Sequence, residues 1–153
     1  MRALKLIQHM RANGEQMSRA VIQKIRISER CSQLVLNVTA EEQKQSNLAI
    51  VEDLTDWLAT ENEARIKERY VTLGMRRAQQ GVSFTQLFWA VCIAHEYLWE
   101  YIQQECLLEE AVDFWGGVKL LHSLTKFFDH ALHFTLVRYQ KVGKAEVVGA
   151  PAA

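Results

Sequence analysis

The sequence predicts an all-α protein, a single-domain helical bundle of about five or six helices. The chain has one proline, at position 151, and its seven glycines are widely spaced, so long segments contain no helix breaker. Three segments begin with Ser or Thr followed three residues later by Glu or Gln, which is the capping-box pattern of a helix start. The length of 153 residues and the 49% hydrophobic content suit one domain with a substantial core.

The helices are expected in six segments between these breakers. In chain order they cover residues 2–13, 15–36, 40–59, 61–79, 83–107 and 117–141. The capping boxes start the third, fourth and fifth segments: Thr39 with Glu42, Thr60 with Glu63, and Ser83 with Gln86. The stretch LVLNV at 34–38 is rich enough in β-branched residues to suit a strand, but we interpret it as the end of the second helix. An extra helical turn fits 109–115.

Neither a signal peptide at the amino terminus nor a membrane-spanning helix is expected. The basic amino terminus is interrupted by polar residues too often for a signal peptide. No apolar run approaches the roughly eighteen residues of a membrane-spanning helix. Residues 142–153 are small and unpatterned, as in a flexible tail or linker, so the helical domain is expected to span 1–141.

The charge balance and the cysteines narrow the class of protein. Eighteen Lys and Arg balance eighteen Asp and Glu, so neither nucleic acid nor a membrane surface is expected as a partner. Cys31, Cys92 and Cys106 are widely spaced and form no CxxC pair, so neither a disulfide framework nor a zinc site is indicated. These features favour a cytoplasmic protein.

The expected helix 83–107 is apolar on two sides. At about 100° of rotation per residue, one face has His95 near its centre and consists of Phe84, Leu87, Phe88, Val91, Cys92, His95, Leu98, Trp99, Ile102 and Cys106. The other side carries Trp89, Ile93 and Tyr97. Such a helix is either central in its own bundle or covered by a partner. Trp89, Ile93 and Tyr97 are therefore candidates for a dimer or partner interface, with packing inside the chain as the alternative.

His95 has two interpretations. A neutral imidazole on an apolar face can bind haem or another ligand, or it can form a hydrogen bond inside the core. Bulky aromatics around one polar group are typical of a small-molecule pocket, and the candidate lining is His95, Phe88, Trp99 and Phe128. We interpret His95 as a core or pocket-lining residue.

Neither a catalytic nor a metal site is assigned. Nucleophile motifs, glycine-rich phosphate loops and HExxH are absent, and no histidine follows a Glu by three residues as in a di-iron bundle. His122, Asp129, His130 and His133 have helical spacing, but most of them share a polar face with Lys126 and are expected to be solvated.

Two runs of sequence carry a family likeness: LTDWLATENEARIKERYVTLGMRRAQQGVSFTQLFWAV at 54–91 and LTKFFDHALHFTLVRYQK at 124–141. They contain a Leu73-Gly74 step, an Arg-Ala-x-x-Gly pattern from Arg77 to Gly81, and FFD at 127–129. Over about residues 39–141, the chain resembles the amino-terminal domain of the RsbT co-antagonist proteins RsbR and RsbD.

The resemblance implies an all-α, globin-like or bundle-like sensory module that is dimeric, lacks catalytic activity and signals to a partner or an attached domain. In that family the module commonly precedes a STAS-type output domain within a stress-signalling complex. The present sequence stops after its tail, so it is expected to be a stand-alone relative or a piece of a longer protein.

The same stretch is distantly similar to haem-binding sensor globins. Arg77 stands where their proximal histidine would be. Arginine stays protonated and cannot offer a neutral nitrogen to iron. This departure disfavours haem, so no cofactor is expected.

Two functions remain open at this point. The first is a non-enzymatic bacterial signalling or regulatory module that acts through helix packing in a homodimer. The second is a globin-like sensor in which His95 contacts haem or a small apolar molecule. No acid, base and nucleophile converge in the pattern, so an enzyme is not expected.

Overall fold

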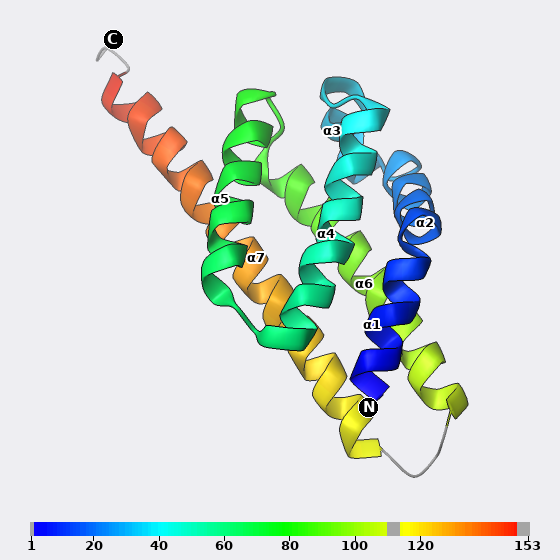
Figure 1. Ribbon diagram of the computed structural model, residues 1–153. Helices are drawn as coiled ribbons and strands as arrows, with labels where there is room; N and C mark the ends of the chain where they lie inside the picture. Colours follow the sequence, from blue (N-terminus) through cyan, green and yellow to red (C-terminus); the bar gives the residue numbers. More distant parts are fainter. Residues whose placement is uncertain (1, 110–113, 150–153) are drawn as a thin grey trace.

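The computed structural model confirms the all-α fold class (Figure 1). It describes residues 2–109 and 114–149, and no strand occurs in that part of the chain. The described residues form a single domain of seven α-helices and one 3₁₀ turn, η1, so the helix count slightly exceeds the expected five or six. The elements are α1 (Arg2–Ala12), α2 (Gly14–Arg26), η1 (Glu29–Cys31), α3 (Ser32–Asn37), α4 (Ala40–Thr60), α5 (Glu63–Gln79), α6 (Phe84–Glu109) and α7 (Phe114–Gly149).

The extra helix arises because the segment expected as one helix over 15–36 is broken. α2 ends before Ile27, Ser28 is extended (φ −87°, ψ 120°), and the Cys31 N–H donates to the Ser28 carbonyl at 3.1 Å. Serine favours such breaks because it competes with helical hydrogen bonds. After the break, Cys31 and Leu34 are both buried in the core. The helical interpretation of 34–38 is confirmed as far as Asn37, and only Val38 is extended.

Two of the three expected capping boxes place a helix start correctly. Thr39 accepts the N–H of Glu42 at 3.1 Å before α4, and Ser83 accepts the N–H of Gln86 at 3.4 Å before α6. The prediction for Thr60 is wrong.

Thr60 belongs to the last turn of α4, where its hydroxyl donates to the Asp56 carbonyl at 2.9 Å. Glu61 ends that helix in the left-handed conformation (φ 49°), and Asn62 precedes α5. The capping pattern failed here because Thr60 is still part of α4 and its hydroxyl is bonded within that helix.

The last helix is longer than expected. α7 begins at Phe114 and continues to Gly149, so residues 142–149, which the sequence suggested as a tail, are helical. This segment contains Lys, Ala and Glu, which favour helix, and a helix tolerates a glycine such as Gly143 at a cost of about 1 kcal/mol. Part of the turn expected at 109–115 lies outside the described residues.

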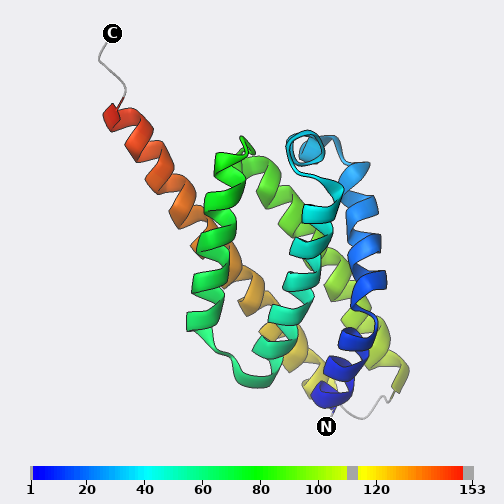
Figure 2. The ribbon, with the colours of Figure 1, turned by 45° about the horizontal axis from the view of Figure 1, so that its top comes forward.

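The helices form two layers. Figures 1 and 2 show α4 and α5 side by side in front of α6 and α7, with α1 and α2 along the other edge of α4. α5 packs chiefly on α7, whereas α4 packs on α1 and α2. The C-terminal end of α7 extends past the other helices in both views. Within the described ranges, no helix combines the length and the hydropathy that crossing a bilayer requires.

A glycine, Gly74, allows α5 to approach α7 closely. A Cβ on Gly74 would lie 2.8 Å from the carbonyl oxygen of Thr135, so only glycine fits here without a shift of the backbone. One turn earlier, Tyr70 meets Phe127 edge to face, with 5.9 Å between ring centroids. Gly81 (φ 76°) then turns the chain from α5 into α6.

Candidate functional site

Three of the four proposed pocket residues lie together. The His95 ring stacks on Phe128 of α7, with 4.6 Å between centroids and 17° between planes, and Trp99 approaches its edge at 6.3 Å. Phe88 lies apart from this group: it is 37% exposed and its ring contacts Phe84 and Trp89, each at 6.1 Å. Phe88 lies on the same face of α6 as His95, as the helical pattern predicted. The pattern could not show that other helices cover only part of that face.

His95 is half-buried between α6 and α7. Burial lowers the pKa of His95, while the carboxylate of Asp129 acts in the opposite direction. The neutral imidazole is therefore favoured near pH 7. Its Nε2 atom is buried and has no hydrogen-bond partner among the described residues. His95 consequently packs as an aromatic ring with one unsatisfied polar atom.

The second apolar side of α6 faces the amino-terminal part of the same chain. The Arg30 guanidinium of η1 lies 4.1 Å from the Trp89 ring centroid, and Lys24 Nζ of α2 lies 5.4 Å from the centroid of Tyr97. Trp89, Ile93 and Tyr97 are partly buried against the core. α6 therefore has two apolar sides because it runs between α7 and the α2–η1 segment.

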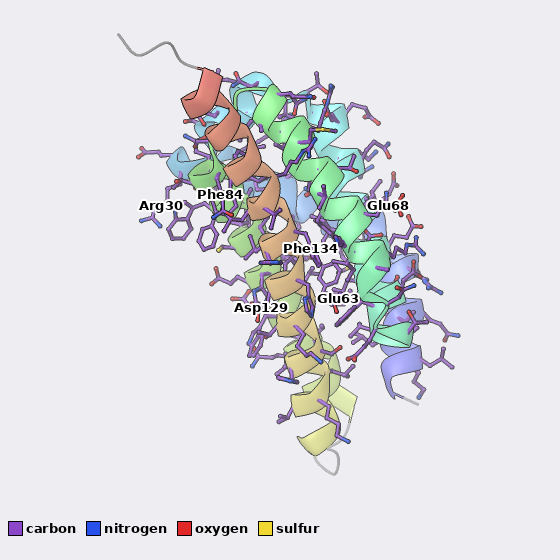
Figure 3. All side chains as sticks on the ribbon, turned by 90° about the vertical axis from the view of Figure 1, so that its left-hand side faces the viewer. Arg30, Glu63, Glu68, Phe84, Asp129 and Phe134 are labelled. Atoms are coloured by element: carbon purple, nitrogen blue, oxygen red, sulfur yellow. The ribbon has the colours of Figure 1, made fainter. Side chains whose placement is uncertain are left out.

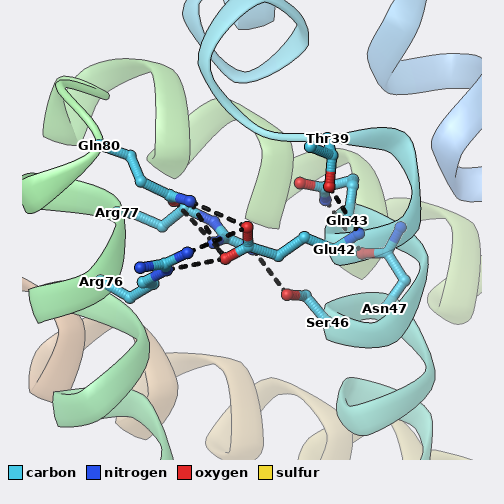
Figure 4. A network of polar contacts seen from close by, with 8 residues as sticks. All are labelled: Thr39, Glu42, Gln43, Ser46, Asn47, Arg76, Arg77 and Gln80. Carbon is cyan, nitrogen blue, oxygen red and sulfur yellow. Dashed lines mark hydrogen bonds and ion pairs between the residues drawn. The ribbon is translucent and has the colours of Figure 1, made fainter.

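A polar network joins α4 to α5 (Figure 4). Arg77 is 1% exposed, and its guanidinium donates to Glu42, Gln80 and Ser46 at 3.0, 2.9 and 2.6 Å. Arg76 Nε donates to the same Glu42 carboxylate at 3.0 Å. These bonds, from Arg76 foremost and then from Gln80 and Arg77, lower the pKa of Glu42 to about 2.

Arg77 is thus a buried structural cation. The sequence analysis recognised Glu42 only as part of a capping box. Its backbone N–H does serve the cap, but its side chain reaches across to α5. Nothing local in the sequence could have shown this contact, because the partners are 34 and 35 positions apart.

Next to this network, a cleft of about 280 Å³ separates α4 from α5. Its lining consists of Glu42, Gln45, Ser46, Ala49, Ile50, Asp53, Arg69, Tyr70, Thr72, Leu73, Arg76 and Arg77. At the end opposite Glu42, the Asp53 side chain is only 2% exposed. Arg69 Nε lies 3.2 Å from one carboxylate oxygen of Asp53 and Arg65 Nε lies 4.0 Å from the other. Burial raises the pKa of Asp53, although the charges of Arg69 and Arg65 act against this rise.

The histidine-rich face of α7 offers no metal-binding arrangement. His122, Asp129 and His133 are exposed, as expected, but His130 is half-buried. The His130 ring lies 5.5 Å from the Trp57 ring, and its Nδ1 lies 3.8 Å from a carboxylate oxygen of Glu63. Across the described residues, no three His, Cys, Asp or Glu side chains are grouped closely enough to hold a metal ion.

Comparison with known proteins identifies a family. The sequence model of the RsbT co-antagonist protein rsbRD N-terminal domain matches residues 15–144. This range contains α2 without its first residue, α3 to α6, most of α7, and both the Glu42 network and the cleft. Neither the curated proteins nor the solved structures contain a match to the chain.

Proposed function

The chain belongs to the family of RsbT co-antagonist protein rsbRD N-terminal domains, and from this membership we propose that it is a non-enzymatic signalling module. It acts in the cytoplasm as a homodimer, and it passes a signal to a protein partner or to an attached output domain. The observation that carries the proposal is the family match over 15–144, because it covers nearly all of the helical bundle.

Helix α7 supports a mechanism based on helix packing. Its first half contributes Leu124, Phe127 and Phe128 to the core, so it moves with the bundle. The same helix continues to Gly149 and extends beyond the bundle (Figures 1 and 2). A helix shifts as a rigid element, because its backbone hydrogen bonds are internal. A change in packing around Phe127 therefore displaces the projecting end, where a partner or output domain can respond.

The proposed dimer surface includes Trp89, Ile93 and Tyr97, together with the exposed edge formed by Phe88. Trp89 is only partly covered by Arg30, which leaves area for a second copy. Aromatic residues beside an arginine are typical of the energetically important centre of protein interfaces.

The substitution Trp89→Glu tests this surface. We expect it to convert a dimer into a monomer in size-exclusion chromatography with light scattering, since it buries a charge against the second copy. The fold should survive, because Arg30 lies close enough to pair with the new carboxylate. Gln79→Glu places a new charge at an exposed position of α5, away from this surface, and should remain dimeric. An unchanged Trp89→Glu dimer excludes this surface.

A second candidate is a ligand sensor centred on His95, with Trp99 and Phe128 beside it. The buried and unsatisfied Nε2 atom favours this candidate, since a ligand could supply the missing hydrogen bond. The substitution His95→Leu should then abolish binding of haem or of a small apolar molecule. Equal binding by the wild type and His95→Leu excludes a role for this residue.

A further inference from the structure

Met75 is the most accessible of the three methionines whose side chains the structure describes. Met10 and Met17 are 0% and 1% exposed and lie in the core. Met75 is half-buried, on the side of α5 that contacts α7. A dissolved oxidant must touch a thioether sulfur to react with it, so exposure governs how fast a methionine is oxidised. Such an oxidant should therefore reach Met75 well before the two core methionines.

The sulfur of Met75 is in contact with a guanidinium. Arg138 Nη2 of α7 lies 3.0 Å from Met75 Sδ, and both side chains are half-buried. A thioether is only a weak hydrogen-bond acceptor. The Arg138 side chain has no other hydrogen bond and no ion pair with the described residues. The cation therefore lacks a strong acceptor at this contact.

This pair lies beside the close approach of α5 to α7. Met75 follows Gly74, where a Cβ would clash with the backbone of Thr135. Because the two backbones are in contact there, atoms added between the helices cannot be absorbed without a shift. Among the described side chains, Arg138 and Tyr139 make the last hydrogen bonds of α7 before it extends past the bundle (Figures 1 and 2). A chemical change at Met75 can therefore alter how α7 leaves the bundle.

Oxidation would replace the weak acceptor at this position with a strong one. The sulfur lone pair of Met75 attacks one oxygen of hydrogen peroxide, and the O–O bond breaks. The departing hydroxide takes the proton of the transferred hydroxyl group and leaves as water. The thioether is thereby oxidised by two electrons to a sulfoxide, and the peroxide is reduced to water. The sulfoxide oxygen carries partial negative charge, and hydrogen bonds from an ionised donor are about twice as strong as neutral ones.

We propose that Met75 is an oxidation site for hydrogen peroxide and that the Arg138 guanidinium binds the resulting sulfoxide. A charge-assisted hydrogen bond then joins α5 to α7 in place of the contact with sulfur. The modification is reversible, because methionine sulfoxide reductases restore the thioether. This site goes beyond the proposed signalling function, because oxidation requires neither a dimer nor an output domain.

The first test is peptide mapping by mass spectrometry after brief treatment of the full chain with hydrogen peroxide. Trypsin separates the three methionines, since an arginine lies between each one and the next. The peptide with Met75 should gain an oxygen atom at least about tenfold faster than those with Met10 and Met17, because the latter are buried. Unfolding the chain in urea should abolish this difference. The measurement needs no substitution, so it does not depend on the folding of a variant.

The second test compares thermal unfolding of the oxidised and untreated chain with and without Arg138. In Arg138→Leu the sulfoxide has no ionised donor, so oxidation should lower the midpoint by about 3 °C more than in the wild type. Met75→Leu has a similar volume and is the matched control, alone and combined with Arg138→Leu. Its shift reports other oxidised residues, such as the half-buried Cys92, and is subtracted. Reductases for both sulfoxide epimers should restore the midpoint.

Two results would overturn the proposal. One is oxidation of Met75 no faster than that of Met10 and Met17, and the other is a shift on oxidation that Arg138→Leu leaves unchanged. Arg138→Gln, which removes the charge but stays polar, serves in its place if the leucine variant does not fold. Neither result bears on oligomeric state, so the signalling function is judged separately by the Trp89→Glu experiment.

Discussion

The two sides of helix α5 are held by different kinds of contact. Towards α7 the contacts are close and apolar: Tyr70 meets Phe127 edge to face, and Gly74 lies against the backbone of Thr135. Figure 3 shows α5 and α7 running side by side, with Phe134 between them. Close packing of this kind resists any change in volume. This side therefore fixes where α5 lies.

Towards α4 the contacts are polar and enclose a cleft. Glu42 is shared by Arg76 and Arg77 at one end, and Asp53 faces Arg69 at the other. Polar groups of this kind can exchange partners without a change in volume, so a bound molecule or a change in charge can alter the arrangement on this side. The α4 side of α5 is therefore the more adaptable of its two sides.

The largest loss of folding stability is expected from Glu42→Ala. This change leaves the buried Arg77 guanidinium without its carboxylate, and breaking a buried ion pair by removing one partner costs about 3–5 kcal/mol. Urea unfolding should show this loss. Glu41→Ala removes an exposed carboxylate from the same turn and should stay within about 0.5 kcal/mol of the wild type. Equal losses in the two variants would contradict a structural role for the Glu42 network.

A smaller loss is expected on the apolar side from Gly74→Ala. The added methyl group would meet the Thr135 carbonyl, and overpacking of this kind costs about 1–3 kcal/mol. Gly117→Ala in α7 is the matched control, because a Cβ there meets nothing within 4 Å. That control should gain up to about 1 kcal/mol of stability through helix propensity. If Gly74→Ala is stabilising as well, α5 and α7 are not in the close contact described.

The smallest change in folding stability is expected from Asp53→Asn, and it should be a gain. Burial raises the pKa of Asp53 above its ordinary value of 3.8, so the ionised carboxylate destabilises the folded state at neutral pH. The variant should be more stable than the wild type at pH 7, by less than about 1 kcal/mol, since the charges of Arg69 and Arg65 already offset part of the cost of burial. This advantage should shrink as the pH falls through the raised pKa and vanish below 3.8.

Glu42 provides the internal contrast in the same acid titration. Its pKa in the folded state, about 2, lies below its ordinary 4.5, so the stability it contributes is complete above pH 4.5 and is lost as the pH falls towards 2. Glu42→Gln should remove this part of the pH dependence, whereas Asp53→Asn should remove the part with the opposite sign. Identical pH profiles for the two variants would show that the two ends of the cleft do not differ in the way proposed.

The sequence predicted those parts of the fold that depend on local pattern. In α7, Leu124, Phe127 and Ala131 recur in the sequence at helical spacing, and all three are buried in the structure. The cap at Thr39 was equally predictable, because both of its partners lie within one turn. The break at Ser28 was not, since a single serine is also compatible with a continuous helix.

The candidate site was predicted only in part. His95 and Phe128 were named together as candidate pocket residues and their rings stack in the structure, whereas Phe88 lies apart from them. Asp53 gave no signal, because a lone acidic residue on an amphipathic helix is usually solvated. Its burial depends on Arg65 and Arg69 of α5, which lie against its carboxylate, and only tertiary packing determines that arrangement.

A native mass spectrum of the purified wild-type chain tests the central claim most directly, because it reports assembly and any retained ligand together. A dimeric signalling module predicts a species at twice 17.6 kDa. A monomer at micromolar concentration, with no species of twice that mass, would contradict the proposed homodimer and with it the mechanism of helix packing between two copies.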